Sequence, residues 1–133
     1  MMKESRITAY FMRVDKDEMY RGYFGEIENT LKAKQKYVGG IIQVIHLTPE
    51  IDVICNDDGK LLRLPLNRLW IENDRPLDVF AGNIMCVRHC AGEFTSILES
   101  DREVIEERLL PYAGTLGRTF LLYKEETLPE FKE

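Results

Sequence analysis

Two runs of apolar, β-branched and aromatic residues stand close together near the start of the chain, at positions 7–14 and 19–24. The four residues between them, 15–18, are all charged. Two strand-like runs separated by a short polar cluster are typical of a β-hairpin. We therefore expect a hairpin at the start of the fold.

The apolar spacing changes in residues 26–38, where Ile27, Leu31 and Val38 fall on one helical face. Glutamates come first in this segment and lysines follow, which is the order that complements a helix dipole. Gly39-Gly40 then supplies a residue that can adopt the left-handed conformation at the end of a helix. The pattern predicts a helix over residues 26–38.

Residues 41–47 carry the strongest strand pattern of the chain, with apolar side chains on both faces. A strand of this kind is typical of a sheet interior. Residues 51–55 and 60–66 then flank Asp58-Gly59, a pair that tolerates the positive φ angles of a tight turn. We expect an interior strand followed by a second hairpin.

Residues 67–76 are mostly polar and are interpreted as a connecting loop, after which residues 77–89 predict another strand with a bend at Gly82. Ser100 and the glutamate three positions later have the spacing of a capping box, which predicts that a helix begins there. Pro111 would end that helix.

These elements predict an α+β fold, in which a mixed or mainly antiparallel sheet of about five or six strands packs with two helices. The helices are expected near residues 26–38 and 100–110. A chain of 133 residues has the length of one domain. We place that single domain at residues 1–123 and treat residues 124–133 as a charged C-terminal tail.

Charge narrows the range of partners. The chain has 18 Lys+Arg and 23 Asp+Glu, a net charge of −5, and residues 1–92 hold 13 of each sign. The remaining 5 basic and 10 acidic residues, and hence the whole excess, lie in residues 93–133. Because duplex binding needs a net basic face to displace counterions, we expect no generic nucleic-acid binding.

The sequence also indicates a compartment. No run approaches the roughly 18 apolar residues of a membrane-spanning helix, and the start MMKESRITAY lacks the apolar core of a secretory signal. Cys55, Cys86 and Cys90 are an odd number of cysteines spread along predicted strands, which fits a reducing environment. We therefore expect a cytoplasmic protein with no membrane partner and no disulfide.

A metal site is the first chemistry to consider. Cys86, His89 and Cys90 are close in sequence, and His46 and Cys55 lie on neighbouring predicted strands. Structural zinc sites usually show two paired-ligand knuckles, and the second pair is missing here. Buried free cysteines are common in apolar cores. The sequence therefore predicts no metal site and no cofactor.

Nucleophilic catalysis would need a nucleophile with a base in hydrogen-bond reach, and His46 and His89 are the only histidines. His89 and Cys90 are neighbours on a strand, so their side chains point to opposite faces. A pairing of His46 with Cys86 or Cys55 across strands stays open. Since no nucleophile motif is present, we assign no catalytic residue. A small hydrolase or transferase that uses His46 or His89 with a cysteine is the alternative.

Basic residues gather after the predicted second hairpin, where side chains at a strand end can converge on a ligand. The guanidinium group of arginine forms a planar fork that suits carboxylate or phosphate. We therefore expect an anionic small molecule, or an acidic protein loop, to bind at this place. The other interpretation is that these are solvated charges on an edge strand. The candidate ligand-binding residues are Lys60, Arg63, Asn67 and Arg68.

The predicted second helix has an acidic outer face that could contact a basic surface, although solvated charges are usual on amphipathic helices. Trp70 is a separate candidate anchor, because aromatic side chains are enriched at interfaces, and the other interpretation places it in the core or at its margin. The candidate partner-binding residues are Glu103, Glu106, Glu107 and Trp70.

Several segments resemble a known family when they are taken together. They are EIENTLKAKQKYVGG running into IIQVIHL, the segment NDDGKLLRLPLNR, the strand entry DVFAGNIMCV, and EFTSI before an acidic helix. This combination resembles domain-of-unknown-function family 3846, over about residues 26–100. The resemblance implies a setting in phages and bacterial mobile elements, where small proteins are often inhibitors, decoys or ligand traps.

The sequence thus favours a non-enzymatic binding protein that inhibits or sequesters a host component, a defence component included. The target would be either a host protein or an anionic, nucleotide-like small molecule. A third hypothesis is a structural or regulatory subunit that pairs through an exposed sheet edge and so forms a homo-oligomer.

Overall fold

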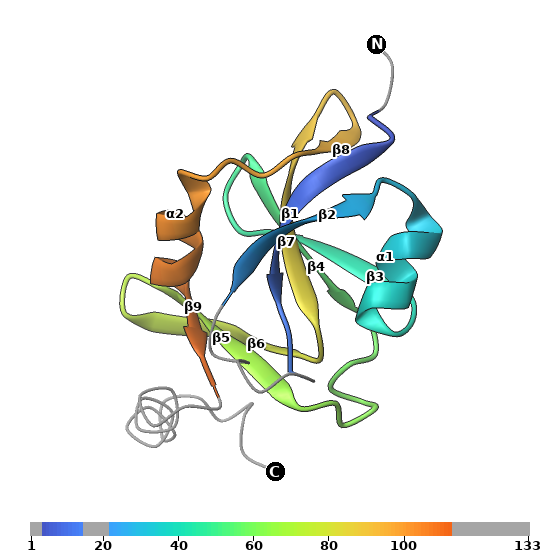
Figure 1. The fold of residues 1–133 in the computed structure, drawn as a ribbon. Helices are drawn as coiled ribbons and strands as arrows, with labels where there is room; N and C mark the ends of the chain where they lie inside the picture. Colours follow the sequence, from blue (N-terminus) through green and yellow to red (C-terminus); the bar gives the residue numbers. More distant parts are fainter. Residues whose placement is uncertain (1–3, 15–21, 113–133) are drawn as a thin grey trace.

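The strands form two antiparallel sheets in the computed structural model, which describes residues 4–14 and 22–112 (Figure 1). The larger sheet has the strand order β2-β1-β7-β4-β3, with β8 paired to β7, and the smaller sheet has the order β6-β5-β9. The larger sheet consists of β1 (Arg6–Met12), β2 (Tyr23–Glu28), β3 (Ile42–His46), β4 (Ile51–Asn56), β7 (Ile84–Cys90) and β8 (Glu93–Thr95). The smaller sheet consists of β5 (Leu66–Glu72), β6 (Arg75–Ala81) and β9 (Leu109–Pro111).

Two apolar clusters cover the two faces of the larger sheet. On one face, helix α1 (Leu31–Val38) packs through Val38 against Ile54 and Met85. On the other face, the smaller sheet and helix α2 (Asp101–Arg108) enclose the larger cluster, to which Phe80 and Ile105 belong. The α+β class and the antiparallel pairing are therefore confirmed, whereas the second sheet was not predicted.

Helix α1 begins five residues later than the pattern predicts. Residues 26–28 continue β2, since Glu26 and Glu28 pair with Thr8 and Arg6 of β1. The helix starts after Thr30, whose Oγ1 accepts a hydrogen bond from the backbone N–H of Ala33 at 3.1 Å. Its end is as expected, because Gly39 is left-handed with φ of 83°.

The strand predicted in the sheet interior is an edge strand. Among the described residues β3 pairs with β4 only, so its second side is free of backbone partners. Ile42 packs toward α1 and Ile45 toward the opposite core, which explains the apolar side chains on both faces. Val44 is exposed.

The predicted second hairpin does not form, because residues 57–63 make turns instead of a strand. Gly59 lies against the backbone of Ala81, where an added Cβ would stand 3.0 Å from the carbonyl oxygen of Ala81. This close approach carries the chain from β4 toward the smaller sheet. A side chain at position 59 would push the two apart.

The predicted loop at residues 67–76 is a hairpin of β5 and β6. Its turn is Asn73-Asp74, with φ of 51° and 61°, and both residue types tolerate this left-handed conformation. The strand predicted at residues 77–89 is divided near Gly82, with φ of 80°, so the expected bend separates two strands, β6 and β7, that belong to different sheets.

The second predicted helix forms, but its capping box does not. Ser100 precedes α2 without a side-chain hydrogen bond to the first turn. The helix ends at Arg108, and Pro111 closes the short strand β9. Neither α1 nor α2 has the length and apolar character needed to cross a bilayer. The charged segment at residues 15–18 and the tail 124–133 lie outside the described residues.

Candidate functional site

The four residues predicted to bind an anion are not gathered on one surface. Lys60 and Arg63 are exposed on the turns after β4, whereas Asn67 and Arg68 are only 1% and 3% exposed. Both buried residues belong to β5, the central strand of the smaller sheet, which packs against the rest of the fold. Their expected place at an exposed strand end is therefore corrected.

Asn67 and Arg68 hold strands together in the interior. The Asn67 amide donates hydrogen bonds to the carbonyl oxygens of Met12 and Gly82, each at 2.8 Å. Arg68 donates to Oδ1 of Asn67 at 2.7 Å and to its carbonyl oxygen at 3.1 Å. Burial lowers the pKa of the Arg68 guanidinium. Asn67 and Arg68 were selected from the sequence because they are polar residues that follow a proline. In the structure these polar side chains form hydrogen bonds inside the fold.

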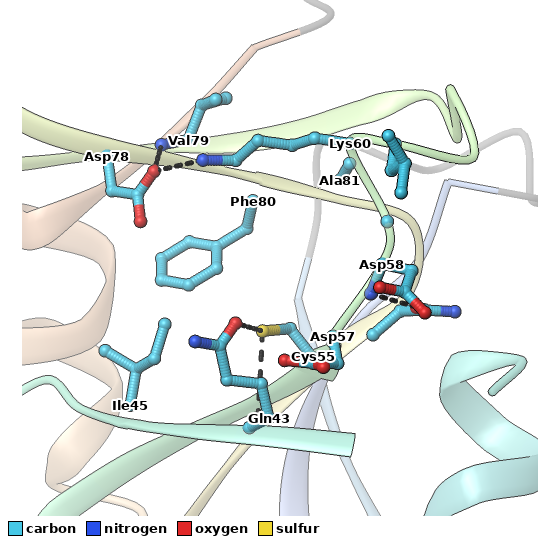
Figure 2. Close-up of a pocket in the computed structure, with 13 residues that line it drawn as sticks. Gln43, Ile45, Cys55, Asp57, Asp58, Lys60, Asp78, Val79, Phe80 and Ala81 are labelled. Atoms are coloured by element: carbon cyan, nitrogen blue, oxygen red, sulfur yellow. Dashed lines mark hydrogen bonds and ion pairs between the residues drawn. The ribbon is translucent and has the colours of Figure 1, made fainter. Parts of the chain in front are cut away.

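A pocket of about 490 Å³ opens between β3, β4, the turns after β4, and β6 (Figure 2). Its apolar lining includes Ile45, Cys55 and Phe80. Figure 2 shows the Phe80 ring facing the two β3 side chains, Gln43 and Ile45, with the ion pair of Lys60 and Asp78 on its other side. The pocket therefore combines an apolar wall with charged groups at its margin.

Three carboxylates and one ammonium group line this pocket, which gives it a formal charge of −2. Asp57 and Asp58 are exposed on the turn after β4. Asp78 accepts hydrogen bonds from Lys60 Nζ at 2.5 Å and from the backbone N–H of Val79 at 2.8 Å. Because Lys60 is already paired, the pocket favours a positively charged group over an anion.

Helix α2 exposes the three predicted glutamates, Glu103, Glu106 and Glu107. Glu106 is less free than the other two, since it accepts a hydrogen bond from the Tyr10 hydroxyl and lies 3.7 Å from Arg102. Burial and the nearby Glu106 carboxylate raise the pKa of Tyr10. The acidic outer face expected from the sequence is thus present.

Trp70 is partly buried against the larger cluster and does not stand alone on the surface. Its ring stacks on Phe80 with centroids 6.2 Å apart, and its Nε1 donates to Glu72 at 3.0 Å. Trp70 therefore fixes the smaller sheet against the core, and only part of its surface could contact a partner.

His46, Asp52 and His89 form a second group of chemically competent side chains. They come from three neighbouring strands, β3, β4 and β7. His46 Nδ1 lies 2.6 Å from one carboxylate oxygen of Asp52, and His89 Nδ1 lies 2.9 Å from the other. The imidazole ring centroids are 5.3 Å apart. A metal ion could be held by these three residues.

From the sequence, we considered both histidines but assigned them to no site, and we did not consider Asp52. A lone carboxylate within the apolar strand residues 51–55 is the signal that could have revealed it, because a buried charge needs a partner. Asp52 pairs in register with His46 across the sheet.

The histidines and the cysteines lie on opposite faces of the larger sheet. Cys55 and Cys86 belong to the cluster under the smaller sheet, while alternation along the strands turns His46 and His89 the other way. Burial raises the pKa of Cys55 to about 11 and raises the pKa of Cys86 as well. The structure thus does not form the His–Cys pairing that the hydrolase or transferase alternative requires.

This arrangement defines an α+β protein of two packed antiparallel sheets, with an acidic pocket on one side of the larger sheet and a His–Asp–His cluster on the other. The chain belongs to the family described as Domain of unknown function (DUF3846), whose sequence model matches residues 7–110. The resemblance seen in the sequence is confirmed, and the match extends it to β1 and α2. No curated protein and no solved structure matches the chain significantly.

Proposed function

We propose that this protein acts by binding and not by catalysis, and that it takes up an extended, positively charged segment of a partner protein. The observation that carries the proposal is the acidic pocket beside the edge of β3 that has no strand partner among residues 4–14 and 22–112. A segment added to that edge would gain backbone hydrogen bonds, which is a common mode of peptide recognition.

The alternation of β3 supports an extended ligand. Gln43 and Ile45 face the pocket, whereas Val44 faces away. Every second side chain of an added strand would therefore lie on the pocket side, next to the carboxylates of Asp57 and Asp58. Lysine or arginine at those places would be attracted by the charge of the pocket and would pack its methylene stem against Ile45, which is partly exposed in the lining.

The two targets considered from the sequence are not equally supported. An anionic, nucleotide-like molecule would need the basic group of Lys60, Arg63, Asn67 and Arg68, of which two members are internal. A protein partner needs an accessible surface with complementary charge, and the pocket and α2 both carry negative charge. We further propose that the partner is a protein of the host of a phage or mobile element, and that binding inhibits it. The support for this part of the proposal is the family resemblance.

The test is a binding titration of the full chain with a fluorescent peptide of alternating valine and lysine. We expect saturable binding that weakens with added salt. Replacing Asp57, Asp58 and Asp78 with asparagine removes three negative charges from the pocket, and at about 0.2–1 kcal/mol for each charge we expect affinity to fall about tenfold.

The matched control removes the same charge from α2 and the segment just before it, by replacing Glu99, Glu103 and Glu107 with glutamine. Affinity should change less than twofold. Amide NMR shifts on β3, with those of the other edge strand, β2, as the reference, locate the peptide. Equal losses in both triple variants would contradict the proposal and indicate unspecific charge attraction. A larger loss in the α2 variant would move the interface to the helix.

Pairing between two copies of the chain is the alternative role for the edge of β3. If β3 pairs with β3 of a second copy, light scattering will show a mass that rises with concentration. A stable dimer whose β3 amides are protected from exchange would overturn the peptide proposal in favour of the sheet-edge subunit. A monomer at all concentrations supports it.

A further inference from the structure

The His–Asp–His cluster lies on the face of the larger sheet opposite the acidic pocket, and its construction needs a separate explanation. Asp52 is only 2% exposed, although its side chain is an ionisable carboxylate. In the described part of the chain, the side-chain hydrogen bonds to that carboxylate come from two imidazoles, one on each oxygen. A buried carboxylate is stabilised when its partners are charged or coordinate a cation.

The geometry brings three potential metal-binding atoms to one place, two imidazole nitrogens and one carboxylate oxygen. One donor atom from each residue can be chosen so that all three lie within 4.8 Å of one another. Ligands of a tetrahedral ion at about 2.1 Å stand about 3.4 Å apart, so an ion would need only small side-chain shifts. Two imidazoles and one carboxylate are a donor set that first-row transition metals accept.

Access to the cluster comes from the strand edge. The His46 side chain is 69% exposed and that of His89 is 34% exposed, while Asp52 forms the floor. An ion can therefore enter from solvent, and water or a partner group can complete its coordination. The sheet fixes the three backbones, because β3, β4 and β7 are hydrogen-bonded neighbours.

We propose that His46, Asp52 and His89 bind one divalent transition-metal ion of the zinc and cobalt class, through both Nδ1 atoms and the carboxylate. On binding, the ring proton of each neutral imidazole moves from Nδ1 to Nε2, so the ion replaces the two hydrogen bonds to Asp52. The proposal does not rest on the peptide proposal, whose pocket lies on the other face of the sheet.

The test uses untagged full-length protein freed of metal by a chelator and titrated with zinc chloride in a calorimeter. We expect one zinc ion per chain. His46→Ala and His89→Ala each remove a ligand and should weaken binding at least about tenfold. Asp52→Asn should weaken it similarly. Since His46 is exposed, its variant tests the site without disturbing the core.

Cys90→Ala is the control, because the exposed Cys90 thiol follows His89 at the end of β7 and is another group that can bind zinc. This variant should bind zinc as the wild type does. Imidazole nitrogen shifts should show Nδ1 coordination at both histidines, and bound cobalt should give a visible absorption band. Absence of one-to-one binding, binding retained when both histidines are replaced, or binding lost in Cys90→Ala would each overturn the proposal.

Discussion

Asp101 is a buried carboxylate that fixes the start of α2. Arg88 donates two hydrogen bonds to it, from Nε at 2.7 Å and from a terminal nitrogen at 2.8 Å, and the backbone N–H of Leu98 donates a third at 2.9 Å. The Arg88 guanidinium, together with the Leu98 N–H, holds the pKa of Asp101 below its usual range. A bidentate pair of this kind is among the stronger charge-assisted contacts.

The Asp101–Arg88 pair predicts a defined pH dependence. Because the folded-state pKa of Asp101 is lowered, its contribution is complete above the unfolded value near pH 4 and is lost as pH falls through the folded value. Asp101→Asn keeps the acceptor for Leu98 but loses the charge, and should cost about 2 kcal/mol at pH 7. Urea unfolding of both proteins checks this. A difference in unfolding free energy that is the same at pH 3 and pH 7 would contradict the ionic origin.

At the residue scale, the sequence reveals chemical type more readily than burial. It drew attention to His46 and His89 as the histidines of the alternative enzymatic hypothesis, and to Arg68 as a cation that could bind a ligand. The surroundings of these side chains depend on strands distant in sequence: Asp52 reaches His89 only because β4 and β7 pair. No local pattern encodes that pairing.

At the scale of the element, the two helix starts offer a direct contrast. The sequence predicts a cap at Ser100, whereas the structure shows a cap hydrogen bond at Thr30 and none from the Ser100 side chain. The reason is local: Ser100 has helical backbone angles, with φ of −66° and ψ of −16°, whereas Thr30 is extended as a cap requires.

Thr30→Ala should therefore lower the free energy of unfolding by about 1 kcal/mol, through loss of the bond to Ala33. Ser100→Ala is the matched comparison and should change stability by less than about 0.5 kcal/mol, as for a surface substitution without a partner. Thermal unfolding of the two variants measures both. A larger loss at Ser100 than at Thr30 would show that the capping box forms in solution.

Strands were predicted better than their pairing. The patterns at residues 7–14, 41–47 and 51–55 place β1, β3 and β4 within one or two residues. The hairpin of β5 and β6 was missed, because its first strand is rich in polar residues and its turn contains no glycine. Asn67 and Arg68 look like loop residues until their internal hydrogen bonds are known.

For the whole molecule, the sequence predicts the α+β class and the family but not the division into two sheets. That division depends on which strands pair across long separations, as β5 does with β9. The acidic pocket is a product of the same division, since β3 and β6 belong to different sheets. It therefore could not be predicted from local patterns.

The reactivity of the three cysteine thiols shows whether the core is folded. Cys90 is exposed, Cys86 is buried between the sheets, and Cys55 has a pKa raised to about 11 by burial. At pH 8 a thiol of that pKa holds roughly a hundredfold less thiolate than an ordinary one. A thiol reagent should modify one cysteine at once and the other two only as the protein unfolds.

Cys90→Ala is the control for this experiment, and it should lack the fast reaction. Rapid labelling of two thiols in the native wild type would contradict the burial of Cys55 or Cys86. Mass spectrometry of the labelled peptides identifies which residue has reacted.

Strand β3 contributes to both faces of the larger sheet, with Ile45 beside the pocket and His46 at the cluster. An ion that joins His46 to Asp52 and His89 would tie the outermost strand to the two strands behind it and suppress its fraying. A peptide on the same strand would then dock to a backbone already ordered. By thermodynamic reciprocity, peptide would tighten zinc binding by the same factor by which zinc tightens peptide binding.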